Sequence, residues 1–109
     1  MTQALAYGLP VKTFDATTID NTLEGTIFAV PPKPLSQGFI WQTVHATTPS
    51  AISVSLRVSI DGTNWTIIDT STSTAGETRT ILNKQGLFVE GYITSHTGGS
   101  TTTVYIVHF

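Results

Sequence analysis

Residues 51–65 read AISVSLRVSIDGTNW, and they carry the clearest structural signal in the chain. Apolar residues occupy every second position of the first ten, and serines or Arg57 occupy the positions between them. The apolar positions are Ile52, Val54, Leu56, Val58 and Ile60. A period of two is typical of a half-buried β-strand, because successive side chains point to opposite faces of a sheet. The Asp61-Gly62 pair, with apolar residues resuming at Trp65, predicts a hairpin turn.

The composition extends this prediction to the whole chain. Thr occurs 21 times and Ser 9 times among 109 residues. Thr is β-branched and favours strands, and both residues compete with a helix for its backbone hydrogen bonds. No stretch of ten or more residues has a clean helical period, and Gly, Pro, Ser and Asn clusters separate seven or eight short apolar runs. We therefore predict an all-β fold, a two-sheet antiparallel sandwich of the jelly-roll or Ig-like kind.

The expected organisation is an N-terminal arm or edge segment at 1–24, followed by a β-sandwich domain at 25–109. A short strand is expected near 11–14 in the arm. The expected strands of the sandwich are 26–30, 38–46, 51–60, 65–69, 78–82, 87–95 and 103–109. Three prolines, Pro31, Pro32 and Pro34, make the connector after the first of these strands stiff, because proline favours an extended conformation and donates no backbone hydrogen bond.

Charge and cysteine content exclude several classes of function. Charged residues make up only 11% of the chain and the net charge is −2, with no two basic residues adjacent, so we expect no nucleic-acid partner. The chain has no cysteine, which excludes disulfides and thiolate metal sites. Neither a signal peptide nor an apolar membrane span is visible, so we expect a protein made and folded in a cytoplasm, with no membrane partner.

A surface with so few charges offers little repulsion between copies, which favours a protein that packs against other proteins. Two of the expected strands, 87–93 and 104–109, are apolar on both faces, although only one face of a sandwich sheet meets the core. The second face is covered either by the arm or by another subunit. If it is an assembly interface, its expected residues are Phe88, Tyr92, Tyr105, Phe109, Pro31, Pro32 and Pro34.

No pattern of catalytic residues is recognisable. His45, His96 and His108 are far apart in the sequence, and Asp69 and Glu90 are the only acids on the strands we expect. No nucleophile signature accompanies them. We expect a protein without enzymatic activity, with no catalytic residues and no cofactor.

A metal site is not expected either. The loop 61–64 offers oxygen ligands but lacks the carboxylates of a calcium loop. It is predicted to be a tight turn in which Asp61 accepts backbone hydrogen bonds and Gly62 has a positive φ.

Carbohydrate binding is the main alternative for a ligand. Trp41 and Trp65, with the three tyrosines, could stack on sugar rings if several of them share an exposed face. For Trp65 we favour a position as a lid over the open end of the core, and for Trp41 a place in the core or an interface.

Two blocks of the sequence resemble small virion proteins of tailed bacteriophages. The first is VSLRVSIDGTNWTIIDTS (54–71), in which a strand that ends in Asp-Gly-Thr-Asn-Trp precedes a Thr/Ser-rich loop. The second is LFVEGYIT (87–94), followed by Thr97-Gly98-Gly99 and a Val-rich last strand. The resemblance spans about residues 51–107. It departs from the phage pattern near Glu90, where an Arg is usual, so no functional residue is transferred.

Such virion proteins include capsid decoration proteins, tail proteins and fibres. A single compact domain is most similar to a capsid decoration (cement) protein, which would bind the major capsid protein and copies of itself, as a homo-oligomer such as a trimer, on the capsid surface. The alternatives are a carbohydrate-binding or adhesin module of a tail or fibre, and a structural component of a tail or neck.

Overall fold

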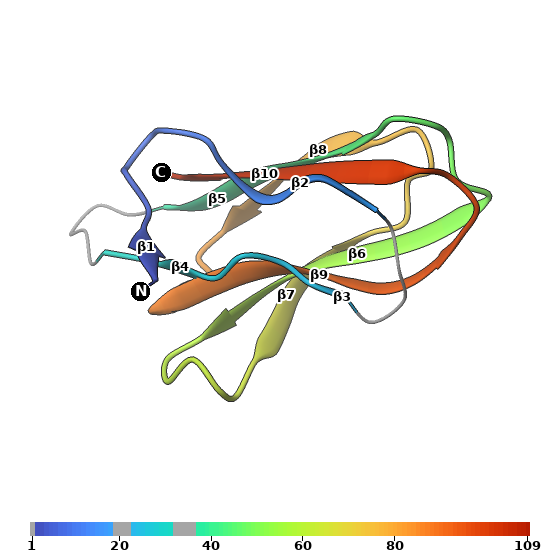
Figure 1. The fold of residues 1–109 in the computed structure, drawn as a ribbon. Helices are drawn as coiled ribbons and strands as arrows, with labels where there is room; N and C mark the ends of the chain where they lie inside the picture. The colour runs from blue at the N-terminus through green and yellow to red at the C-terminus, as the bar shows by residue number, and fades with distance from the viewer. Residues whose placement is uncertain (1, 19–22, 32–36) are drawn as a thin grey trace.

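The computed structural model describes residues 2–18, 23–31 and 37–109. These residues are all-β and form ten strands in two sheets that pack face to face (Figure 1), so the predicted sandwich is confirmed. In the same residues there is no helix with the length and hydropathy needed to cross a membrane.

The two sheets differ in size. The six-stranded sheet contains β1 (Gln3–Ala4), β3 (Leu23–Glu24), β4 (Phe28–Ala29), β6 (Ala51–Ser59), β7 (Thr66–Ser71) and β9 (Phe88–Thr97). The four-stranded sheet contains β2 (Val11–Thr18), β5 (Gly38–His45), β8 (Glu77–Leu82) and β10 (Thr101–His108). Their strand orders are β1-β4-β9-β6-β7, with β3 also paired to β9, and β2-β10-β5-β8. The β1–β4 pair is parallel and the other pairs are antiparallel.

The strand pairs are nested in the sequence. Strand β6 pairs with β7, β5 with β8, β4 with β9, and β2 with β10, so each pair encloses the one before it. Successive pairs alternate between the two sheets. The chain is therefore one long hairpin that is wrapped into a sandwich, with its tip between β6 and β7. This arrangement is a jelly roll, which decides between the two topologies that the sequence leaves open.

The tip of the hairpin is the predicted turn. Oδ1 of Asp61 accepts hydrogen bonds from the backbone N–H groups of Thr63 and Asn64, both at 2.8 Å, and Gly62 has a φ of 77°. Both features were expected of this turn. Ile60 lies in the turn rather than in β6 and is 76% exposed, so its predicted place on the buried side of the strand is wrong. Strand pairing ends at Ser59, and Ile60 is therefore no longer held against the core.

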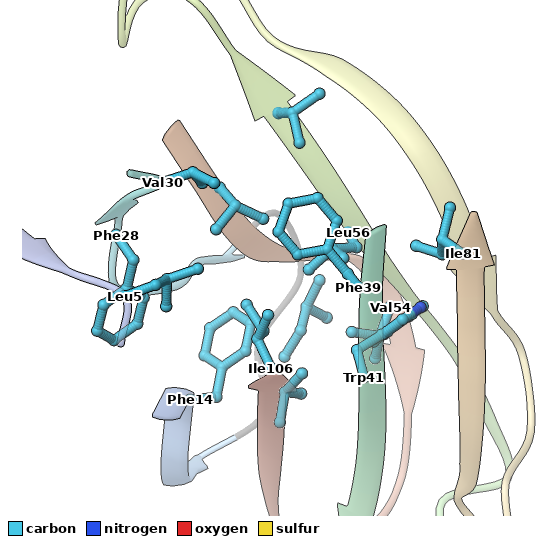
Figure 2. Packing of buried hydrophobic residues seen from close by; sticks show 14 of the residues in the cluster. Leu5, Phe14, Phe28, Val30, Phe39, Trp41, Val54, Leu56, Ile81 and Ile106 are labelled. Carbon is cyan, nitrogen blue, oxygen red and sulfur yellow. The ribbon is translucent and has the colours of Figure 1, made fainter. Parts of the chain in front are cut away.

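The core lies between the sheets (Figure 2). The other four apolar residues of the alternating pattern, Ile52, Val54, Leu56 and Val58, lie in β6 and are buried there, as the period of two predicts. The buried core residues are Leu5, Phe14, Phe28, Val30, Phe39, Trp41, Ile52, Val54, Leu56, Val58, Ile81, Val89, Ile93, Val104 and Ile106.

The first segment of the chain contributes to this core. In its described part, β1 lies at an edge of the six-stranded sheet and β2 at an edge of the four-stranded sheet. Leu5 and Phe14 are each 3% exposed and belong to the same core as the later strands. Strand β2 runs from Val11 to Thr18, longer than the strand expected near 11–14. This segment is therefore an edge of the sandwich itself and does not project from it.

The strand expected at 26–30 is shorter than predicted, and a second short strand precedes it. Only Phe28 and Ala29 form β4, and Leu23–Glu24 form β3, which pairs with the same neighbour, β9. Between them the backbone N–H of Thr26 bonds the carbonyl of Thr13 in β2, at 2.7 Å. The chain thus turns toward the opposite sheet at this point, which breaks the strand.

Candidate functional site

The residues predicted to form an interface lie on opposite sides of the sandwich. Phe88 precedes the buried Val89 and Tyr92 precedes the buried Ile93, so both point to the outer face of the six-stranded sheet. Tyr105 points to the outer face of the four-stranded sheet, where it lines a hollow. Phe88 and Tyr92 therefore do not form one patch with Tyr105.

Phe109 and Pro31, two further residues of the predicted interface, lie after the ends of strands. Phe109 follows β10 and exchanges backbone hydrogen bonds with Gly38 at the start of β5. Pro31 is exposed. Pro32 and Pro34 lie outside the described residues.

The outer face of the six-stranded sheet carries a cluster built around Arg57. Arg57 on β6 lies opposite Glu90 on β9; its Nε donates to Oε1 of that carboxylate, and its Nη2 forms an ion pair with the same oxygen. Its Nη2 also donates to Oε1 of Glu24 at 3.2 Å. The guanidinium lies over the ring of Tyr92, 4.0 Å from the centroid, and over the ring of Trp65 at 5.1 Å. We call these five residues the Arg57 cluster.

The ion pair at the centre of the cluster is buried although it lies outside the core. The side chains of Arg57 and Glu90 are 13% and 0% exposed, whereas that of Glu24 is 66% exposed. Burial raises the pKa of Glu90, and the hydrogen bonds and charge of Arg57 oppose this rise. Oε2 of Glu90 accepts no hydrogen bond from any residue in the described part of the chain. Two aromatic rings thus cover an ion pair on the outside of the sheet, which holds the guanidinium in one orientation.

The two tryptophans considered for carbohydrate stacking lie in different surroundings. Trp41 is 1% exposed and donates from Nε1 to Oδ2 of Asp69 at 2.9 Å, so it has no free ring face; the stacking role considered for it is wrong, and its place in the core is confirmed. Trp65 is partly exposed, but it lies against Arg57 on the outer face of the sheet. The interpretation of Trp65 as a lid over the core is therefore wrong.

An ionic network closes one side of the sandwich. Asp69 on β7 accepts two hydrogen bonds from Arg79 on β8, at 2.7 and 3.0 Å, and Glu77 accepts one from Arg79 at 3.0 Å and one from Ser71 at 2.6 Å. Burial opposes ionisation of Asp69, but the bonds from Arg79 and Trp41 outweigh it, so its pKa lies below the ordinary value. Because β7 and β8 are edge strands of different sheets, this network joins the two sheets.

The histidines do not assemble a site. Nδ1 of His45 lies 2.8 Å from Oγ1 of Thr102, and His108 is buried against the rings of Tyr7 and Phe39. Within the described ranges, no three His, Cys, Asp or Glu side chains are placed to hold a metal ion together.

The outer face of the four-stranded sheet has a different chemistry. A hollow of about 280 Å³ is lined by Pro10, Ile40, Trp41, Gln42, Thr78, Tyr105 and Val107. On β5, β8 and β10, all of which the structure describes, the outward positions hold no Asp, Glu, Lys or Arg. They are Ile40, Gln42, Val44, Thr78, Thr80, Leu82, Thr103, Tyr105 and Val107. At the edge of the same face, Nζ of Lys12 on β2 lies 5.7 Å from the centroid of the Tyr105 ring and 3.3 Å from Oδ1 of Asp15.

The Arg57 cluster was not predicted from the sequence. One available signal is that Arg57 interrupts a row of serines on the polar side of the strand 51–60. A second is that Glu90 stands between apolar neighbours in a strand that is otherwise uncharged. The register between β6 and β9 brings Arg57 and Glu90 together, and this register cannot be read from the sequence.

The whole fold is similar to a solved structure, the crystal structure of SPBc2 prophage-derived protein YomS. The TM-score is 0.66 at 12% sequence identity, over 93% of this chain and 92% of that chain. At this identity the likeness shows a shared fold alone. No protein-family model matches the chain, and no curated protein matches it.

Proposed function

We propose that this chain is a non-enzymatic structural protein of a bacteriophage virion, which binds the outside of the capsid and stabilises its lattice. Three observations support the proposal. The fold is shared with a prophage-derived protein, jelly rolls recur in viral capsid and lectin domains, and residues 51–107 resemble small phage virion proteins.

We base the proposed contact with the capsid shell on the Arg57 cluster. Trp, Tyr and Arg are the residues that dominate binding energy in protein interfaces. Arg57 is already held between Tyr92, Trp65 and Glu90, so a partner that covers it immobilises little additional side-chain freedom. We assign this face to the major capsid protein.

Stabilisation then follows from mass action. A protein that binds the assembled lattice but not its separated subunits stabilises the lattice by its binding free energy. Many copies on one shell add their contributions, so modest contacts suffice.

The test uses capsids of the encoding virus that were assembled without this protein. Added wild-type protein should bind at concentrations up to about 10 µM and raise the temperature at which the capsids disrupt. Trp65→Ala should weaken binding by about 30-fold, which corresponds to the loss of about 2 kcal/mol at an interface hot spot. Leu9→Ala, which truncates an exposed apolar side chain between β1 and β2, is the control and should bind like wild type.

Two results would contradict the proposal. One is the absence of capsid binding by folded wild-type protein. The other is binding to a glycan array that is lost in Trp65→Ala, which would instead support the carbohydrate-binding alternative.

A further inference from the structure

We propose that the partner of the Arg57 cluster presents a basic side chain, a lysine or an arginine, to the carboxylate of Glu24. This inference rests on the proposed function and deepens it, because it names the chemical group that the capsid protein would place against this face.

The charge that the cluster displays to solvent is negative. In the six strands of this sheet, all of them described, Arg57 is the only lysine or arginine, and Glu24 and Glu90 are the two acids beside it. The remaining acid of these strands, Asp69, bonds Arg79 of the other sheet. Arg57 and Glu90 are largely covered, whereas the side chain of Glu24 is 66% exposed. A partner therefore meets the carboxylate of Glu24 first.

Arg57 does not use up the binding capacity of Glu24. Nε of Arg57 donates to Glu90, and Nη2 is shared between Glu90 and Glu24, 3.2 Å from Oε1 of Glu24. One guanidinium thus serves two carboxylates. A basic group on the partner would give Glu24 a counterion of its own, whereas an acidic group in the same place would be repelled.

A second carboxylate lies along the same face. Ser59 follows Arg57 by two residues on β6, so both side chains point to the same side of the sheet. The hydroxyl of Ser59 bonds Oδ1 of the exposed Asp61 at 2.9 Å. Hydrogen bonds within the turn hold the pKa of Asp61 well below its ordinary value, so it is charged at neutral pH. Within the described residues, no lysine or arginine forms an ion pair with it.

The apolar neighbours of the cluster suit the stem of a basic side chain. Trp65 is partly exposed, and Ile67, which pairs with Arg57 across the strands, is 52% exposed. Lysine and arginine have long methylene stems that pack on apolar surface below the charged group, and the face of an aromatic ring attracts a cation. The rings and the carboxylate therefore favour the same kind of partner side chain.

The experiment measures binding to capsids that were assembled without this protein, at about 50 mM and about 500 mM NaCl. Glu24→Gln removes the charge but keeps an oxygen that can accept from Arg57. It should bind about 5-fold more weakly than wild type at low salt and less than about 2-fold more weakly at high salt, because salt screens an exposed ion pair. Glu24→Lys should bind at least about 30-fold more weakly at low salt, because it places a positive charge opposite the partner's own.

The matched control is Asp15→Asn. Asp15 is a carboxylate of similar exposure, 70%, that bonds Lys12 at 3.3 Å on the other sheet. This variant should bind like wild type at both salt concentrations. Thermal melts of all variants should lie within about 5 °C of wild type, which excludes unfolding as the cause of weaker binding.

Equal binding of wild type and folded Glu24→Gln at low salt would overturn this inference and leave the proposed function standing. Tighter binding by Glu24→Lys would do the same, because the partner group would then be acidic. A loss in Glu24→Gln that is equal at both salt concentrations would also overturn it, since a contact without charge is not screened. If wild type does not bind capsids, the proposed function and this inference are both wrong.

Discussion

Asp61 organises the tip of the hairpin. In addition to the two backbone donors of the turn, Oδ2 accepts from Nδ2 of Asn64 at 2.7 Å, and Oδ1 accepts from the hydroxyl of Ser59 at 2.9 Å. The backbone N–H groups of Asn64 and Thr63 are the main reason why the pKa of Asp61 lies well below its ordinary value. A carboxylate in this position is therefore stabilised in the folded state relative to the unfolded chain.

This arrangement predicts an acid-dependent loss of stability. Because the folded pKa of Asp61 is lowered, its contribution is fully present above the unfolded value of about 3.9 and is lost as the pH falls further through the folded pKa. Asp61→Asn should lower the Tm by several degrees at neutral pH, and the difference from wild type should shrink below about pH 4. Thermal melts by circular dichroism over this pH range measure both effects. Asp69 and Glu77, whose pKa values are also lowered, remain in both proteins and cancel in the comparison.

The control is Asp15→Asn, which changes an exposed carboxylate that bonds Lys12 at 3.3 Å. It should leave the Tm within about 2 °C of wild type. A constant Tm difference between wild type and Asp61→Asn over the whole pH range would contradict the role assigned to this carboxylate.

Among the elements, β2 shows how the first segment of the chain is held. The hydroxyl of Thr13 accepts a hydrogen bond from the backbone N–H of Gly91 in β9 at 2.8 Å and donates to the carbonyl of Thr26 at 2.9 Å. A Cβ on Gly91 would lie 2.6 Å from Cγ2 of Thr13, so only glycine permits this approach between the two sheets. Strand β2 therefore closes one side of the sandwich, as the Asp69–Arg79 network closes the other.

Phe14→Ala should accordingly destabilise the whole domain. Removal of a fully buried Phe costs about 3–5 kcal/mol, which corresponds to a fall in Tm of about 10–20 °C for a domain of this size. Thermal melts measure the change. Thr17→Ala in the same strand, at a partly exposed position, should shift the Tm by less than about 5 °C. If Phe14→Ala melts like wild type, residues 11–18 are a dispensable arm.

For the whole molecule, we expect the nested topology to determine the folding rate. The outermost pair, β2 with β10, aligns Thr18 with Thr101, and among the described strands no pair except the one at the tip is local in the sequence. Such non-local contacts require closure of long loops before they contribute to stability.

We therefore expect folding on a timescale of milliseconds to seconds, as for other sandwich proteins. Stopped-flow refolding from urea, followed by tryptophan fluorescence, measures the rate, because Trp41 becomes buried in the core. Complete refolding within microseconds would contradict the nested topology as the determinant of the rate.

The sequence by itself determined the elements whose chemistry is local. The alternation in 51–60 places four side chains in the core, and Asp61 and Gly62 form the turn, because a strand period and a turn depend on residues that are close together in the chain. The all-β sandwich follows from many such local signals.

Only the tertiary structure decided which faces those side chains share. Arg57 meets Glu90 because of the register between β6 and β9, and Trp41 reaches Asp69 across the sandwich. The aromatic residues on β9 and β10 looked equivalent in the sequence, yet the two strands lie in different sheets. Register and sheet membership arise from contacts between residues far apart in the chain, and no local pattern encodes them.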